Sequence, residues 1–158
     1  MAADTQITTN QVLEAISTLP IRKNNNRLNA TYEGQKAQSL VLGYYFNSWS
    51  KTQKLAVETT RHPEIWNLLC QFMNQHDPNF KFTAITINKN FLCKPHVDGN
   101  NTGNSYIIGL GDYEGGELNV NGTKYDIHNK FLLFDGKVIH WTEPFVGTRY
   151  TLVYYLSL

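Results

Sequence analysis

Cysteine and methionine are scarce in this chain of 158 residues, which has two of each, and there are only five prolines. Two cysteines, Cys70 and Cys93, cannot form a disulfide framework, and so low a number is typical of a reducing compartment. No apolar run approaches the roughly 18 residues that cross a bilayer. The N-terminus lacks the basic and apolar regions of a secretory signal. We therefore expect an intracellular protein, nuclear or cytoplasmic, that has no membrane partner.

A large excess of charge is also missing, because 14 basic residues nearly balance 13 acidic ones and leave a net charge of +1. This argues against a strongly basic surface over the whole protein. The stretch 20–62 differs, since it has seven basic residues against two acidic ones, a net charge of +5. Such a local excess can reach phosphates, although an ordinary solvated surface gives the same count.

Apolar residues make up 41% of the chain and aromatic residues 13%, enough to bury one sizeable core. We expect a single domain over 1–158 that acts as a monomer. Helices and strands up to about residue 80 would support a core formed by about 81–158.

Two helices are predicted in the first half of the chain. Apolar residues at helical spacing predict one over Gln11–Leu19, with N-caps on offer at residues 8–10. The second is predicted over Pro63–Gln75, since proline is tolerated in the first turn. Between them, residues 21–34 are rich in asparagine and predict a loop or irregular strand, and Ser39–Phe46 is apolar enough for a strand.

From residue 81 onward, short apolar segments alternate with turn signals such as Asn121-Gly122. This rhythm favours a mainly β, jelly-roll core with flanking helices over alternating βαβ units. The predicted strands are Lys81–Ile87, Phe91–Val97, Ser105–Leu110, Glu117–Val120, Thr123–Ile127, Phe131–Phe134, Val138–Thr142 and Arg149–Leu156.

The run Lys-Pro-His-Val-Asp puts His96 and Asp98 two residues apart in an extended segment. Residues two apart in a strand share a face, so both side chains can reach one metal ion. With His140 from a later strand they form the two-histidine, one-carboxylate triad of non-haem Fe(II) oxygenases. Arg149 and Thr151, on one face of the last strand, would add a guanidinium and a hydroxyl for the distal carboxylate of 2-oxoglutarate.

Other interpretations of these residues remain open. Zinc accepts the same three ligands, but a zinc site would not explain the arginine and hydroxyl that follow. The remaining histidines, His62, His76 and His128, have no partners at useful spacing, and we expect them at the surface or at caps.

The stretch from Asn88 to Tyr106, followed by Gly-Asp-Tyr-Glu-Gly-Gly-Glu-Leu, resembles the catalytic core of the TET/JBP family of 2-oxoglutarate-dependent dioxygenases. Those enzymes hydroxylate the methyl group of 5-methylcytosine or thymine in nucleic acid. The resemblance is best over 83–156. It implies a double-stranded β-helix, Fe(II) and O2 with 2-oxoglutarate as cosubstrate, stimulation by ascorbate, and a nucleic-acid partner, DNA rather than RNA.

Carried over by position, the resemblance makes His96, Asp98 and His140 the catalytic iron ligands. It makes Arg149 the anchor of the 2-oxoglutarate C5 carboxylate, and it adds Thr151 and Asn119 to the cosubstrate site. The substrate residues that it implies are Asn101, Asn88, Asn90 and Ser157. Ser157 is also a departure, because relatives that act on 5-methylcytosine tend to have a base-contacting histidine there.

The substrate has further candidates. Arg22–Arg27 is a candidate contact for a nucleic-acid backbone, and the aromatic segment Tyr44–Trp49 could stack on a base. A protein or peptide hydroxylase of the prolyl type would use the same triad and late arginine. A jelly-roll binding module without catalysis is the alternative of another class.

Overall fold

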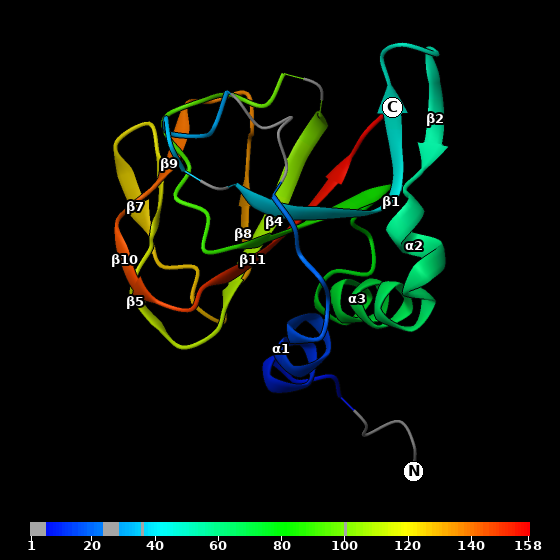
Figure 1. Cartoon of the computed structure of the whole chain (residues 1–158), viewed down its shortest axis with the longest axis horizontal. Coiled ribbons are helices and arrows are strands. Elements are labelled where there is room, and N and C mark those ends of the chain that lie inside the picture. Colours follow the sequence, from blue (N-terminus) through cyan, green and yellow to red (C-terminus); the bar gives the residue numbers. More distant parts are fainter. Residues whose placement is uncertain (1–5, 24–28, 36, 100) are drawn as a thin grey trace.

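The computed structural model describes residues 6–23, 29–35, 37–99 and 101–158, and most of its regular structure is antiparallel β-sheet (Figure 1). The largest sheet has six strands in the order β2-β1-β3-β11-β4-β8. Their bounds are β1 Gln38–Asn47, β2 Thr52–Leu55, β3 Ala84–Lys89, β4 Thr102–Leu110, β8 Leu132–Phe134 and β11 Tyr150–Leu156. The predicted mainly β, jelly-roll class is confirmed.

Two smaller sheets lie to one side of the large one. The first has the order β7-β6-β9, and the second pairs β10 with β5. Their bounds are β5 Tyr113–Gly115, β6 Leu118–Val120, β7 Thr123–Tyr125, β9 His140–Thr142 and β10 Phe145–Gly147. The Asn121-Gly122 turn joins β6 to β7 as predicted, with positive φ angles of 50° and 99° that suit a tight hairpin.

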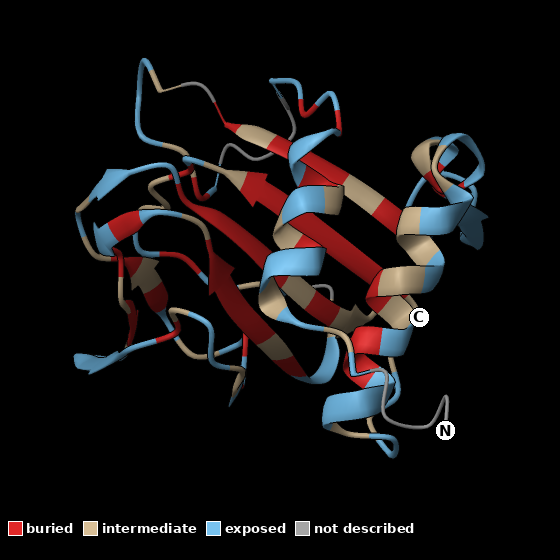
Figure 2. Cartoon of the chain, turned by 90° about the horizontal axis from the view of Figure 1, so that it is seen from below, coloured by how far each residue is buried: buried red, intermediate tan, exposed pale blue. Residues whose placement is uncertain are grey.

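Helices cover one face of the large sheet (Figure 2). They are α1 Thr9–Ser17, α2 Val57–Arg61 and α3 Pro63–His76. The first helix begins with a capping box, in which the Thr8 side chain accepts from the Gln11 backbone and the Gln11 side chain accepts from Thr8. On α3, the Leu69 carbonyl accepts a 2.8 Å hydrogen bond from the Tyr154 hydroxyl of β11. No helix among the described residues is long and apolar enough to cross a membrane.

The central strands alternate strictly between the two faces of the sheet. Ile85 and Ile87 on β3 and Leu152 on β11 are fully buried under the helices. Burying a side chain of this size contributes about 1.5–3 kcal/mol. Their neighbours Thr86 and Thr151 point to the other face, which the helices leave open. That polar face holds the candidate site.

Gly43 marks the point where β1 leaves the sheet. Its φ is +92°, and a Cβ at this position would lie 2.6 Å from the Trp66 ring. The pairing of β1 with β3 ends at Gly43, whereas residues 44–47 continue in pairing with β2. Glycine is therefore required here, and it lets the β1–β2 hairpin project from the large sheet.

Some boundaries and elements differ from the prediction. The predicted strand Phe91–Val97 is wrong, because this segment forms only isolated bridges at Cys93 and His96, and Pro95 has no N–H for a ladder. The first helix begins two residues earlier and ends two residues earlier than predicted. The elements that the pattern missed are β2, α2, β5 and β10.

Candidate metal and cosubstrate site

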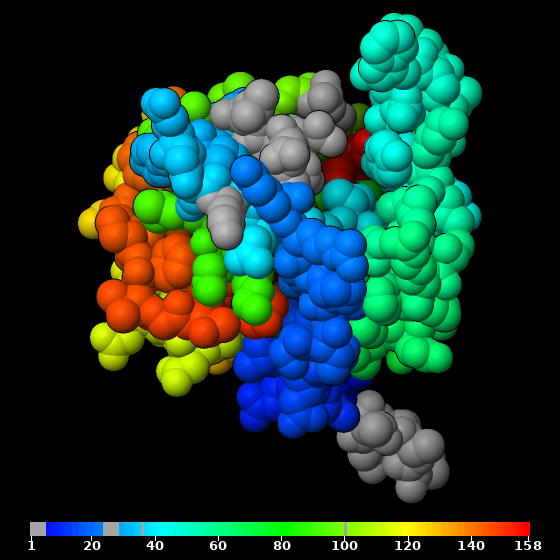
Figure 3. Space-filling view, viewed as in Figure 1, coloured from blue at the N-terminus to red at the C-terminus, as the bar shows by residue number. Residues whose placement is uncertain are grey.

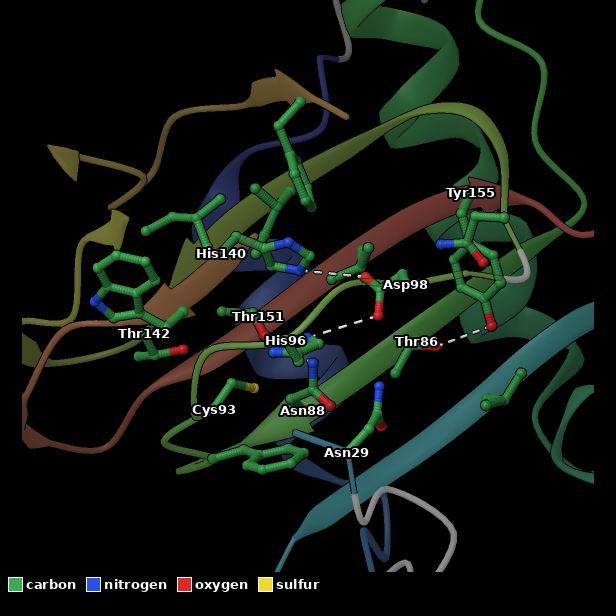
Figure 4. Close-up of a pocket in the computed structure, with 18 of the residues that line it drawn as sticks. Asn29, Thr86, Asn88, Cys93, His96, Asp98, His140, Thr142, Thr151 and Tyr155 are labelled. Carbon is green, nitrogen blue, oxygen red and sulfur yellow. Dashed lines mark hydrogen bonds and ion pairs between the residues drawn. The ribbon is translucent and has the colours of Figure 1, made fainter. Parts of the chain in front are cut away.

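A pocket of about 340 Å³ opens on the polar face of the large sheet (Figure 4). Its floor comes from β3 and β11, and its wall comes from residues 91–99 and from β9, which are bridged to each other at His96 and His140. A volume of this size is within the range of small-molecule sites. The predicted metal ligands, Arg149 and Thr151 all line this one pocket.

The three predicted ligands converge at one point. Asp98 Oδ1 lies 3.6 Å from His96 Nε2, and Asp98 Oδ2 lies 3.3 Å from His140 Nε2. One ligand atom from each residue lies within 4.8 Å of the other two. The histidines are buried, and the aspartate is partly exposed toward the pocket. This spacing fits a single metal ion bound by three ligands.

Hydrogen bonds at the other ring nitrogens fix how the histidines face the site. His96 Nδ1 lies 2.6 Å from the Lys94 carbonyl oxygen, and His140 Nδ1 lies 2.8 Å from the Val138 carbonyl oxygen. A carbonyl can only accept, so in the neutral rings the proton is on Nδ1. Both Nε2 lone pairs then face the Asp98 carboxylate, an arrangement that a bound metal cation would stabilise.

The backbone holds these ligands in register. His96 and His140 exchange two backbone hydrogen bonds, of 3.1 and 3.0 Å, and the Asp98 N–H donates to the Gly136 carbonyl at 2.7 Å. A Cβ on Gly136 would lie 3.3 Å from the Asp98 carboxylate oxygen. The turn at Gly136 therefore places Asp98 by close contact, and any larger residue there would push on the ligand.

Arg149 is a buried cation beside this triad. Its side chain lies between the rings of Tyr113 and Phe145, with 5.6 and 5.4 Å from the guanidinium carbon to the ring centroids. Burial lowers the pKa of Arg149, because desolvation disfavours the charged form, and Tyr113 opposes this effect.

The guanidinium group is only partly paired. Arg149 Nη2 donates to the Gly116 carbonyl at 2.9 Å, but Nε is buried and has no hydrogen-bond acceptor among the described residues. A buried, unsatisfied donor on a cation is costly. A carboxylate from a bound keto acid would satisfy it, so Arg149 fits the predicted role of cosubstrate anchor.

Thr151 and Asn88 form a polar pair on the pocket floor. The Asn88 amide donates to Thr151 Oγ1 at 3.1 Å, and both residues are buried. The two lie opposite each other in the β3–β11 register. With its oxygen held by Asn88, the Thr151 hydroxyl keeps a proton to donate to a bound anion.

The other predicted contacts divide into two groups. Asn101 and Ser157 line the pocket, so contact with a substrate stays a prediction for both. Asn90 and Asn119 are outside its lining and have other partners: Asn90 Oδ1 accepts from the Arg149 backbone at 2.7 Å, and Asn119 Nδ2 donates to Glu143 at 3.1 Å. Their direct ligand contacts remain untested predictions. Residues 24–27, most of the predicted backbone contact Arg22–Arg27, lie outside the described residues.

Several lining residues were not predicted. Thr86 donates to the Tyr155 hydroxyl at 3.0 Å toward the end of the pocket away from the metal ligands (Figure 4). Trp141 follows the ligand His140, and its indole N–H donates to Glu143 at 2.8 Å. The signal for Tyr155 is its spacing, since it follows Thr151 by four residues and so shares its face of β11.

No family model and no curated protein matches the chain. Solved structures of low sequence identity share its fold. One is an oxidoreductase of the 2OG-Fe(II) oxygenase family from Burkholderia pseudomallei, with a TM-score of 0.62 and 16% identity over 92% of this chain and 76% of that one. Another is NgTET1 in complex with 5mC DNA, with a TM-score of 0.59 and 16% identity over 78% of this chain.

The match to NgTET1 spans 62% of that chain, less than two thirds of its length. A Pseudomonas putida prolyl-4-hydroxylase also shares the fold, with a TM-score of 0.50 and 12% identity over 95% of this chain and 84% of that one. The fold is thus that of 2-oxoglutarate- and Fe(II)-dependent oxygenases, and no single branch of them stands out.

Proposed function

We propose that this chain is an Fe(II)- and 2-oxoglutarate-dependent dioxygenase that hydroxylates the methyl group of a pyrimidine base in nucleic acid. The observation that carries the reaction class is the presence, in one pocket, of the converging His96, Asp98 and His140 side chains and a buried cation with an unsatisfied donor. A structural zinc site would use the three ligands but has no need of Arg149.

In this scheme each residue has a distinct task. The triad would hold Fe(II), which with 2-oxoglutarate supplies the activation of O2 and the conversion of the keto acid to succinate and CO2. Arg149 binds the distal carboxylate through its free donor, and the Thr151 hydroxyl donates to the same anion. The two Nδ1 hydrogen bonds keep the imidazole rings aimed at the metal.

Nucleic acid as the substrate class is supported by the walls of the pocket. Aromatic side chains of Tyr45, Phe46 and Tyr155 offer flat surfaces to a base, and Asn101 and Thr86 offer polar groups to its edge. A base within a polymer has to leave its stack to reach a site of this depth. The likeness to NgTET1, solved with 5mC DNA, agrees with this choice at the level of fold.

A peptide or protein hydroxylase is the second candidate. The observation that favours it is the shared fold of the prolyl-4-hydroxylase, which covers more of this chain than the match to NgTET1 does. The reaction class is therefore tested by succinate release, and the substrate class is tested separately by identifying the hydroxylated product.

The test is incubation of the protein with Fe(II), ascorbate and 2-oxoglutarate, with DNA that contains 5-methylcytosine or thymine. We expect succinate release and a hydroxymethyl base in the digested nucleosides, measured by mass spectrometry. His96→Ala and Asp98→Ala should abolish both. Unchanged succinate release in both variants would remove the iron assignment. Succinate release with no altered base, together with hydroxylation of a proline-containing peptide, would move the substrate to the second candidate.

A further inference from the structure

The β1–β2 hairpin presents aromatic and apolar side chains that are partly or almost fully exposed. Trp49 at its tip is 95% exposed, Tyr44 is 48% exposed, and Leu55 is 40% exposed. The hairpin projects beyond the rest of the molecule in the space-filling view, where it is coloured cyan to turquoise (Figure 3). An exposed tryptophan beside other apolar residues is typical of a binding surface.

Hydrogen bonds hold the tip of the hairpin in a defined shape. Asn47 Oδ1 accepts from the backbone N–H groups of Trp49 and Ser50 at 3.0 and 3.1 Å. The Lys51 N–H donates to the Asn47 carbonyl at 2.9 Å. The Trp49 indole therefore extends from an ordered turn into solvent.

Ser157, which directly follows β11, fastens the hairpin at its Phe46–Gln53 pair. Ser157 Oγ accepts from the Phe46 N–H at 2.9 Å, and the Ser157 carbonyl accepts from the side chain of Gln53 on β2. Ser157 was predicted as a substrate residue. Its hydrogen bonds give it another task, because they join the hairpin to the end of β11, the strand that carries Thr151 and directly follows Arg149.

The apolar stripe of the hairpin runs toward the pocket. Tyr44 pairs across the hairpin with Leu55, and Phe46 is two residues further along β1, so these three side chains share a face. Phe46 and Tyr45 line the pocket, whereas Tyr44 and Trp49 do not. The aromatic side chains of the hairpin therefore begin at the pocket with Tyr45 and Phe46 and continue outside it with Tyr44 and Trp49.

The charge of the hairpin indicates the chemistry of its partner. Lys51 and Lys54 are exposed, and the chain has no acidic residue between Glu33 and Glu58. In the described part of the chain, no carboxylate lies within ion-pair distance of either lysine. Aromatic rings and lysines on one hairpin, with Lys54 paired across from Tyr45, suit a single nucleic-acid strand, whose bases stack and whose phosphates attract cations.

We propose that this hairpin binds the nucleic-acid strand next to the base in the pocket, with Trp49 stacked on an exposed base and Lys51 and Lys54 on phosphates. The choice of polymer rests on the function proposed above. The existence of a binding surface on the hairpin does not rest on that function, because the contributions of Trp49 stacking and of the lysine charges to binding can be measured without turnover.

The test measures the affinity of a fluorescein-labelled single strand of about 12 nucleotides, a length that suits one such surface, by anisotropy at low salt. Loss of one stacked base should weaken binding by about 5- to 150-fold in Trp49→Ala. Trp49→Phe should keep part of the affinity. Val146→Ala is the matched control, because Val146 is 80% exposed on β10, and it should bind like the parent.

The lysines are tested by salt dependence. For a single strand, the slope of log affinity against log salt should become shallower by about 0.7 for each of Lys51→Gln and Lys54→Gln. Trp49→Ala should keep the parent slope. Succinate release without nucleic acid should be unchanged in all of these variants, because none of the residues contacts the triad or Arg149.

The proposal would be overturned if the parent and Trp49→Ala bound the single strand with equal affinity. It would also be overturned if the parent protein formed a dimer that this substitution dissociates. A third contrary result is tight binding of a peptide that depends on Trp49, while DNA and RNA strands do not bind. Failure of the proposed function is seen separately. It appears as absent succinate release in a parent protein whose binding of a nucleic-acid strand still depends on Trp49.

Discussion

The two faces of the large sheet are formed by the same strands but have opposite chemistry. Toward the helices, Ile87 and Leu152 are fully buried among apolar neighbours. Toward the pocket, the next residues along the same strands are Asn88 and Thr151, which are almost as buried but hydrogen-bonded to each other. At these positions burial is therefore nearly equal on the two faces, and only the residue type differs.

This difference separates stability from binding within single strands. The helix-covered face gains free energy from apolar burial. The pocket face contains groups that lose free energy on burial unless they are paired, and the Arg149 cation is the extreme case because its Nε has no acceptor. Substitutions on successive residues of β11 should thus change different measurements.

The largest effect on binding is expected for Arg149→Met. Breaking a buried ionic pair on one side costs about 3–5 kcal/mol, so the 2-oxoglutarate concentration needed for succinate release should rise by well over tenfold. The free energy of unfolding without 2-oxoglutarate should be unchanged or higher, because the variant no longer buries a charge. Calorimetry of binding and urea unfolding measure the two quantities. An unaltered 2-oxoglutarate requirement would contradict the anchor role.

Leu152→Ala should produce the largest effect on stability. Truncation of a fully buried leucine costs about 2–5 kcal/mol, which urea unfolding would show as a lower midpoint. Below that midpoint, the 2-oxoglutarate requirement should stay close to that of the parent, because the side chain faces the helices. A loss under 1 kcal/mol, or a change in cosubstrate binding alone, would break the division between the faces.

Thr151→Val removes the hydroxyl of the polar residue next to Leu152. Its effects on 2-oxoglutarate binding and on stability should be smaller than those of the two preceding variants. The variant loses one hydroxyl donor to the anion and leaves the Asn88 amide without this acceptor. Each such loss costs on the order of 1–3 kcal/mol, so both 2-oxoglutarate affinity and stability should fall. Thr151→Ser keeps the hydroxyl and is the matched control. If serine and valine weaken 2-oxoglutarate binding equally, the hydroxyl has no role in it.

The alternation of the faces on β3 could be predicted from the sequence, because Ile85 and Ile87 are apolar and Thr86 and Asn88 are polar. On β11 the signal is weaker, because Val153 also faces the pocket. The three candidate ligands could be picked out for a related reason, since His96 and Asp98 are close in the chain and His140 lies in a short apolar segment, and the structure brings them together. The strand assumed for residues 91–97 was wrong, yet one isolated bridge between His96 and His140 keeps the candidate ligands together. The placement of His96 and Asp98 thus depended on the extended course of residues 91–97 and not on continuous strand pairing.

The hairpin and the partners of the asparagines could not be predicted in the same way. Strand β2 is exposed at every residue, so it has no apolar alternation to signal it. Ser157 and Asn119 have partners 111 and 24 residues away, Phe46 and Glu143. Contacts between such distant residues depend on how the strands fold over one another, and no local pattern contains that information.

Glu143→Gln, in the segment that follows β9, should have the smallest effect on stability of the variants considered. Hydrogen bonds from Asn119 and Trp141 lower the pKa of this carboxyl below its ordinary value of 4.5. A lowered folded-state pKa means that the ionised form contributes stability above the unfolded-state pKa, and that this contribution disappears as pH falls through the folded-state value. The unfolding midpoint of Glu143→Gln should therefore lie below that of the parent near neutral pH and approach it in acid. A difference of the same size at both pH values would mean that the charge of Glu143 does not stabilise the Trp141 wall.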